Sequence, residues 1–341
     1  MAKTRRRRSL STPPTGATRL SPAGPSAARV GRSKPRPRVG RAREVGRPRW
    51  WVSIAMVALV VAIGLVGWWA SIAFRGDDKR ATAGGVDPIA TLESPDVHSI
   101  LVDPNDLDHV FFGSHSGIQE SRDGGFTWDV GGLRDADAMG LAVSPKDATT
   151  LYAAGHDVFQ LSRDGGKTWQ PLGHNLPGAD VHAFAQDPSE PGRLYAYLAG
   201  GDVFASGDGG ITWAPLPTQP PGGGAFALAS NGTALYAATQ AGIVSSRDHG
   251  ATWALLPAQP PGGAITLAVT AADPLRLYVG TQTGLVKSSD DGRTWSLVGP
   301  PDVLALALAV APSEPNRVMF VAEGGGVYRS DDGGVSWIAP R

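Results

Sequence analysis

The hydrophobic positions divide the chain into three parts. Residues 1–49 contain few apolar residues, and residues 51–74 form one uncharged run. After residue 88, short apolar runs alternate with turns rich in Gly, Asp and Pro. Short runs of this kind between turn residues are typical of β-strands, so the last part of the chain is expected to be all-β.

The apolar runs after residue 88 recur in groups of four. The first group predicts strands at His98–Asp103, His109–Ser114, Gly117–Ser121 and Thr127–Val130. The last group predicts strands at Leu304–Val310, Arg317–Ala322, Gly326–Ser330 and Ser336–Ala339. Each group therefore predicts one four-stranded sheet, whose first strand is innermost.

An octet of the form Ser-x-Asp-x-Gly-x-x-Trp marks the turn between the third and fourth strands. It occurs six times, with starts separated by 41, 44, 40, 42 and 42 residues. A period near 42 residues is typical of a four-stranded propeller blade. The shared Asp and Trp positions are Asp123, Trp128, Asp164, Trp169, Asp208, Trp213, Asp248, Trp253, Asp290, Trp295, Asp332 and Trp337.

The residue types in the octet suit a tight turn that leads into a packed strand. The Asp carboxylate can accept backbone N–H groups two or three residues on. Gly supplies the positive φ that such a turn requires. The Trp ring is expected to pack between neighbouring blades. The octets are therefore interpreted as structural.

The octet resembles the Asp-box, or BNR repeat, of sialidases, Vps10-type receptors and Ycf48-like assembly factors. With six copies, the resemblance predicts a single six-bladed β-propeller over residues 88–341. Blades that stack into a ring protect their sheet edges, and Ile89–Glu93 is expected to fasten this ring by lying beside Trp337–Ala339.

The first 87 residues are predicted to anchor this domain. Residues 1–49 are expected to be a disordered cytoplasmic tail, because they lack the apolar residues needed for a core. Residues 50–74 predict one transmembrane helix, flanked by Trp50, Trp51, Trp68 and Trp69. Residues 75–87 are expected to be a polar linker. A cleaved signal peptide is the alternative, although its basic leader would be far too long.

The distribution of charge predicts how the chain is oriented in the membrane. Residues 1–50 hold 15 of the 31 Lys and Arg residues and a single acid, whereas the remainder carries a net charge of −14. The positive-inside rule places the basic end in the cytoplasm and the propeller outside the cell membrane. No aromatic residues interleave with the bases of the tail, so nucleic-acid binding is not expected. The chain has no Cys, which excludes disulfides and thiolate metal sites.

Alignment of the six repeats gathers polar residues on the face opposite the Asp-boxes. His98 is level with Met139, His182, Ala225, Ile265 and Leu306 in the later repeats. The candidate ligand face contains Asp96, His98, His115, Asp137, His156, Asp180 and His182. His with Asp can form a transition-metal site. Hydrogen-bonded caps of the inner strands are the simpler interpretation, and neither a metal nor a cofactor is predicted.

The catalytic set implied by the sialidase resemblance is not found. The chain has no Arg-Ile-Pro motif, and Tyr152, Tyr195, Tyr236 and Tyr278 occupy equivalent second-strand positions, where an aromatic packs between sheets. We assign no catalytic residue. Asp-box xyloglucanases bind substrate between two propellers, whereas one is present here.

The sequence therefore predicts a monomeric, membrane-anchored, extracytoplasmic propeller that binds an envelope protein or a surface glycan. The resemblance to Ycf48-like assembly factors favours the protein partner. A divergent sialidase-like glycoside hydrolase and a passive structural or display domain are the alternatives.

Overall fold

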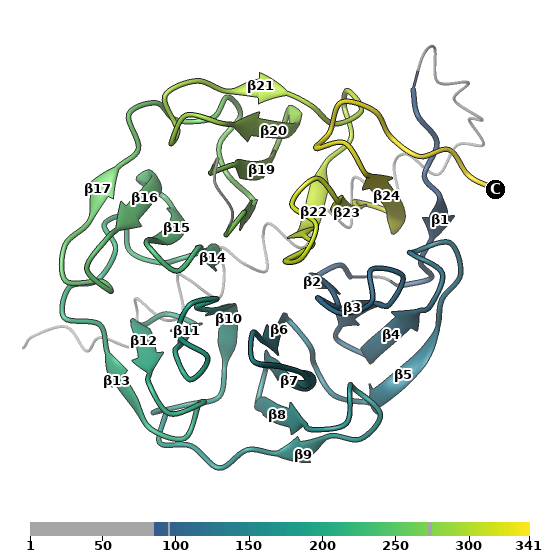
Figure 1. The fold of residues 1–341 in the computed structure, drawn as a ribbon. Helices are drawn as coiled ribbons and strands as arrows, with labels where there is room; N and C mark the ends of the chain where they lie inside the picture. The colour runs from purple at the N-terminus through teal and green to yellow at the C-terminus, as the bar shows by residue number, and fades with distance from the viewer. Residues whose placement is uncertain (1–84, 95, 272–274) are drawn as a thin grey trace, which may run out of the picture. The chain divides into compact units, whose positions relative to one another are not determined.

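The computed structural model describes residues 85–94, 96–271 and 275–341, which form six antiparallel four-stranded sheets around a central axis (Figure 1). Each innermost strand contacts the innermost strands of both neighbouring sheets, so the ring is closed. No helix within these three ranges is long and apolar enough to cross a membrane. The predicted tail, transmembrane helix and residues 75–84 of the linker lie outside the described residues.

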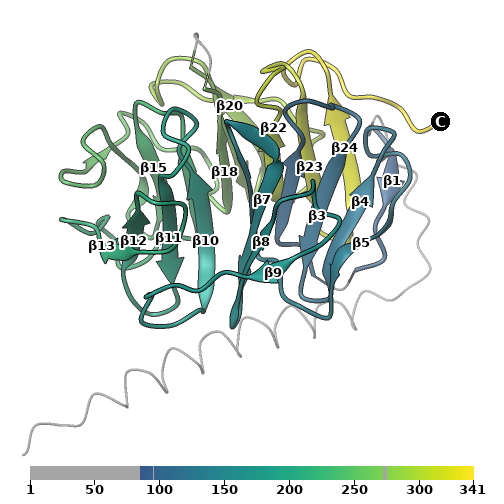
Figure 2. The same ribbon diagram turned by 60° about the horizontal axis from the view of Figure 1, so that its bottom comes forward.

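The strands of each blade follow one another from the axis to the rim, as Figure 2 shows for β10 to β13. Blades 1 to 3 consist of β2 (Ser99–Val102), β3 (Val110–Ser114), β4 (Gly117–Ser121) and β5 (Asp129–Arg134); β6 (Gly140–Ser144), β7 (Asp147–Gly155), β8 (Val158–Ser162) and β9 (Gln170–Pro171); and β10 (Val181–Gln186), β11 (Leu194–Leu198), β12 (Val203–Ser206) and β13 (Trp213–Pro215).

Blades 4 to 6 repeat this order with one exception at the rim. They consist of β14 (Ala227–Ser230), β15 (Leu235–Thr239), β16 (Gly242–Ser246) and β17 (Ala254–Leu255); β18 (Thr266–Val269), β19 (Leu277–Thr281), β20 (Gly284–Ser288) and β21 (Ser296–Leu297); and β22 (Ala305–Val310), β23 (Val318–Ala322), β24 (Gly326–Ser330) and β1 (Ala90–Thr91). The all-β, six-bladed architecture predicted from the repeats is confirmed.

Burial explains why the second strands are apolar on both sides. Every residue of β3, β15, β19 and β23 is buried, because these strands pack against sheets on two sides. Within the described ranges, the buried apolar residues form six clusters. The cluster around Phe112 and Met319, for example, joins blade 1 to blade 6. The blades therefore hold one another in place.

The Asp-box of blade 1 shows how the octet closes its turn. Asp123 Oδ1 accepts the backbone N–H of Phe126 at 3.1 Å and of Thr127 at 2.9 Å. The accepted groups are three and four residues on, one residue further than predicted. Ser121 Oγ accepts the N–H of Gly125 at 2.8 Å. Gly125 has φ +98°, and a Cβ there would lie 2.7 Å from Met319 Cε of the preceding blade.

The box tryptophans pack at the interface with the preceding blade, as predicted. Trp213 is buried in the cluster between blades 2 and 3, and Trp128 packs against the cluster between blades 6 and 1. Their indole N–H groups donate to Gly210 O and Gly125 O within their own boxes. The octet therefore fixes both a turn and an interface.

Acid is expected to weaken the ring through the box carboxylates. Their hydrogen bonds lower the pKa of Asp164, Asp208, Asp248, Asp290 and Asp332 from 3.8 to about 2. A lowered folded-state pKa contributes stability that is complete above about pH 4 and is lost as the pH falls towards 2. The urea concentration at the denaturation midpoint should therefore decrease as the pH is lowered from 4 to 2.5. In Asp208→Asn the loss over this range should be smaller, and an unchanged loss would contradict this assignment.

Ring closure differs from the prediction. Ile89–Glu93 was expected beside Trp337–Ala339, but β1 pairs with β24, with Ala90 opposite Val327. Ile89 N–H donates to Val327 O at 2.8 Å, and Leu92 N–H donates to Gly325 O at 2.9 Å.

The predicted fourth strand Ser336–Ala339 is not formed. The last segment contributes one backbone hydrogen bond, from Ile338 N–H to Arg329 O at 2.8 Å. The beginning of the domain therefore completes the blade formed by its end.

Candidate functional site

The two ends of the central channel differ in chemistry. The inner strands start at one end, where His98 and His182 lie, and finish at the other, where Pro104 and Pro145 lie. The third strands also finish at the proline end, so the Asp-boxes lie there. The candidate ligand face is therefore the end without boxes, as the alignment predicted.

Blade 1 contributes a compact group of one carboxylate and two imidazoles. Asp96 Oδ2 lies 2.6 Å from His115 Nδ1 and 3.6 Å from His98 Nε2. His98 Nε2 and His115 Nδ1 lie 3.1 Å apart. Asp96 Oδ2 also accepts the backbone N–H of His115 at 2.8 Å, which ties the carboxylate to the turn between β3 and β4.

Blade 2 continues the group through a buried carboxylate. Asp137 Oδ2 accepts the backbone N–H of His156 at 3.0 Å and contacts His156 Nδ1. The same oxygen lies 3.9 Å from His115 Nε2 of blade 1. The rings of His115 and His156 are stacked, with centroids 5.5 Å apart. Asp137 therefore links the first two blades.

Blade 3 completes the arc with a more exposed pair. Asp180 Oδ1 lies 3.0 Å from His182 Nε2 and 3.4 Å from His156 Nε2. The side chains of Asp180 and His115 are 50% and 47% exposed, whereas that of Asp137 is 8% exposed. The structure thus brings together all seven predicted site residues, with a buried carboxylate at the centre and reachable groups around it.

His98 is the most buried imidazole of the arc. Burial lowers the pKa of His98, and the neighbouring His115 lowers it further. At pH 7 the ring is therefore neutral and keeps one nitrogen lone pair. A neutral imidazole can accept a hydrogen bond or ligate a cation.

The opposite side of this face is apolar. Blades 4 to 6 contribute Phe226, Ile265 and Leu306 to the channel mouth that His98 and His182 share. Phe226, which is 52% exposed, occupies the position predicted for Ala225. The face therefore has an acidic, histidine-rich half and an apolar half.

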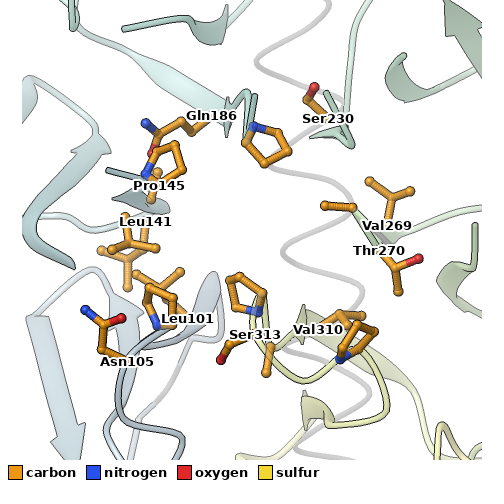
Figure 3. A pocket seen from close by; sticks show the side chains of 18 residues that line it. Leu101, Asn105, Leu141, Pro145, Gln186, Ser230, Val269, Thr270, Val310 and Ser313 are labelled. Atoms are coloured by element: carbon orange, nitrogen blue, oxygen red, sulfur yellow. The ribbon is translucent and has the colours of Figure 1, made fainter. Parts of the chain in front are cut away.

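A cavity that was not predicted from the sequence lies at the other end of the channel. This cavity has a volume of about 530 Å³ and lies on the Asp-box face (Figure 3). All six blades line it, mostly with apolar side chains such as Leu101, Val269 and Val310. The Asp-Pro and Ser-Pro turns could have indicated it, because Pro104, Pro145 and Pro188 all line it.

The four aligned tyrosines, Tyr152, Tyr195, Tyr236 and Tyr278, are buried in their second strands, as the alignment predicted. Tyr236 Oη donates to Asp291 Oδ1 at 3.2 Å, and Tyr278 Oη donates to Gly333 O at 3.3 Å. Both acceptors belong to the Asp-box turn of the next blade. Burial raises the pKa of Tyr195, the equivalent residue of blade 3, to about 12. These phenols therefore stay protonated at pH 7.

A comparison with protein families identifies the same repeat that the octets indicated. The model of the BNR/Asp-box repeat matches residues 160–171, which include the box of blade 2. This chain carries the Asp-box repeat. The comparison with curated proteins found no match.

Solved structures align with this chain at low sequence identity. A xyloglucanase of glycoside hydrolase family 74 from Xanthomonas campestris aligns with a TM-score of 0.52 at 21% identity, over 74% of this chain and 46% of its own. This chain thus spans less than half of that enzyme. A gluconolactonase from Xanthomonas campestris aligns with a TM-score of 0.52 at 16% identity, over 72% and 87% of the two chains. Ycf48 from Cyanidioschyzon merolae aligns with a TM-score of 0.49 at 18% identity, over 74% and 87%.

Proposed function

We propose that this propeller is a binding module of the cell envelope, anchored by the predicted transmembrane helix at residues 50–74. The observation that carries the proposal is the concentration of four imidazoles and three carboxylates on one face, beside an exposed aromatic ring. The partner binds to this face and not to the Asp-box face.

A protein partner fits this face better than a glycan. Protein interfaces combine an apolar or aromatic anchor with polar groups around it. Phe226 supplies an exposed anchor, and Ile265 and Leu306 extend it across the channel mouth. Asp180 and His182 supply hydrogen-bonding groups on the other side of the same mouth. The net charge of −14 after residue 50 favours a partner with basic groups.

The binding face can be tested by affinity capture from gently solubilised native membranes. The full-length protein should enrich a partner that a chain of residues 1–87 does not. In Phe226→Ala, recovery of that partner should fall at least tenfold, because truncation of a central anchor costs about 2 kcal/mol or more.

The matched control is Val335→Ala, which also removes an exposed apolar side chain, but from an Asp-box. Its recovery should equal that of the unmodified protein. Loss in Val335→Ala alone would place binding on the other face and contradict the proposal. Capture of glycans in place of a protein would favour a surface glycan as the ligand. Turnover of a fluorogenic glycoside would favour the alternative of a divergent glycoside hydrolase.

A further inference from the structure

The seven polar side chains of the candidate ligand face form three overlapping groups of potential ligands. In each group, one carboxylate oxygen and two imidazole nitrogens all lie within 4.8 Å of one another. The groups are Asp96, His98 and His115; His115, Asp137 and His156; and His156, Asp180 and His182. The first and last groups share no residue, so both can be occupied at once.

The ligand atoms of the first group lie at distances suited to binding one metal ion. Its three ligand atoms, Asp96 Oδ2, His98 Nε2 and His115 Nδ1, are separated by 2.6, 3.1 and 3.6 Å. Tetrahedral zinc with bonds of about 2.0–2.1 Å places its ligand atoms about 3.3 Å apart. The existing distances bracket this value, so an ion fits after side-chain shifts of a few tenths of an ångström.

The last group has similar spacing in blades 2 and 3. Asp180 Oδ1 lies 3.4 Å from His156 Nε2 and 3.0 Å from His182 Nε2. The rings of His156 and His182 meet edge to face, with centroids 5.0 Å apart. Each outer group offers one oxygen and two nitrogens, and its partly exposed side chains leave room for water as a fourth ligand.

Asp137 stands between the two outer groups in the position of an outer-shell carboxylate. Histidines that bind metals usually donate their second ring N–H to a carboxylate, carbonyl or water. If His115 Nδ1 and His156 Nε2 ligate ions, the other nitrogen of each ring faces Asp137 Oδ2. Among the described residues, the buried Asp137 Oδ1 has no hydrogen-bond partner. A positively charged ion in either outer group would stabilise this carboxylate.

Turn closure accounts for only part of the cluster, namely the bonds from His115 N–H to Asp96 and from His156 N–H to Asp137. In blade 1, Ser114 Oγ donates to Gly117 O and accepts from Ser116 N–H, which closes the turn between β3 and β4. Thr239 closes the same turn in blade 4 without any His or Asp. The Asp180 carboxylate contacts His156 and His182, not the turn of its own blade. The arc therefore exceeds what the fold requires.

We propose that this face binds two divalent transition-metal ions of the zinc class. One ion is held by Asp96, His98 and His115, and the other by His156, Asp180 and His182. Imidazole nitrogen suits Zn²⁺, Cu²⁺ and Ni²⁺, whereas Ca²⁺ and Mg²⁺ prefer sets of oxygen ligands. This inference goes beyond the proposed partner binding and does not depend on it.

The test is calorimetric titration of the untagged, metal-stripped, full-length protein in mild detergent with ZnCl₂. Two Zn²⁺ ions per chain should bind with dissociation constants below 10 μM (about 10⁻⁵ M, or roughly −7 kcal/mol). CaCl₂ should give no saturable heat. His98→Ala with His115→Ala should leave one ion, and Asp180→Asn with His182→Ala should also leave one.

Asp137→Asn separates an outer-shell role from a ligand role. It should keep both ions but weaken their binding about 10–100-fold, as is usual for outer-shell carboxylates. The control is His249→Asn, which changes an exposed histidine in an Asp-box at φ +55° and should leave binding unchanged. Thermal melts of each apo variant establish that it is folded.

Two outcomes would overturn the metal proposal. One is the absence of saturable Zn²⁺ binding to the folded full-length protein. The other is a stoichiometry that the paired substitutions of folded variants leave unchanged. Neither outcome bears on Phe226→Ala capture, so a failure of the metal site is distinguishable from a failure of the proposed partner binding.

Discussion

Trp213→Ala is expected to lower the free energy of unfolding by about 3–5 kcal/mol, the usual range for removal of a buried aromatic. Trp213 is 6% exposed and lies in the cluster that joins blades 2 and 3. Its ring meets Phe159 edge to face at 5.8 Å, and its backbone N–H donates to Asn175 Oδ1. The substitution leaves a cavity at an interface that two blades share.

Trp253→Ala is the matched control, because the same octet places this ring at the interface between blades 3 and 4. Trp253 is only partly buried, and its indole N–H donates to Thr218 O of the preceding blade's outer loop. Its loss should be less than half of that in Trp213→Ala. Urea denaturation followed by tryptophan fluorescence and circular dichroism measures both. Equal losses would show that the box tryptophans stabilise through their turns and not through their burial.

Repeat spacing was sufficient to predict the blades because the octet constrains each of them physically. The box Asp and Gly specify the turn, and the Trp specifies the packed neighbour. The strand predictions for blade 1 are therefore close to the structure, with Gly117–Ser121 confirmed as β4. At the junction of the two ends of the domain no octet marks the pairing. Sequence periodicity therefore could not decide which segment pairs with β24.

At that junction two segments compete for the edge of β24. Ser336–Ala339 follows the last box, which favoured it as the fourth strand. The structure gives most of the edge to β1, because Ile89 and Leu92 bury their side chains in the cluster between blades 6 and 1. Trp337 packs instead beside Phe320 and Tyr328. Burial of apolar side chains, which depends on the closed ring, decides the pairing.

The candidate site was predictable as a face but not as a network. Phasing of the repeats placed four histidines and three carboxylates at one end of the channel. The distances between blades depend on how neighbouring sheets pack, which no local pattern specifies. One signal was available, since His115 follows Asp96 by 19 residues and His156 follows Asp137 by 19 residues. The one-residue error at Phe226 arose because Gly222, Gly223 and Gly224 leave no pattern to align.

Leu92→Ala is expected to lower the free energy of unfolding by about 2–5 kcal/mol, although Leu92 belongs to no repeat. Leu92 is 3% exposed, and its backbone N–H donates to Gly325 O at the end of β1. Loss of its side chain opens a cavity between blade 6 and blade 1, the interface that closes the ring. Because each blade packs against two neighbours, weakening this closure exposes the apolar faces of both blade 6 and blade 1.

The neighbouring Thr91 provides the control, because it pairs with Gly326 in the same strand but is exposed. Thr91→Ala should change the stability by less than about 0.5 kcal/mol. Urea denaturation of the two variants separates side-chain burial from backbone pairing. If Leu92→Ala matched Thr91→Ala, the hydrogen bonds of β1 and Ile338 would suffice to close the ring. The expected difference makes a single leucine outside the repeats as important to the propeller as a tryptophan within them.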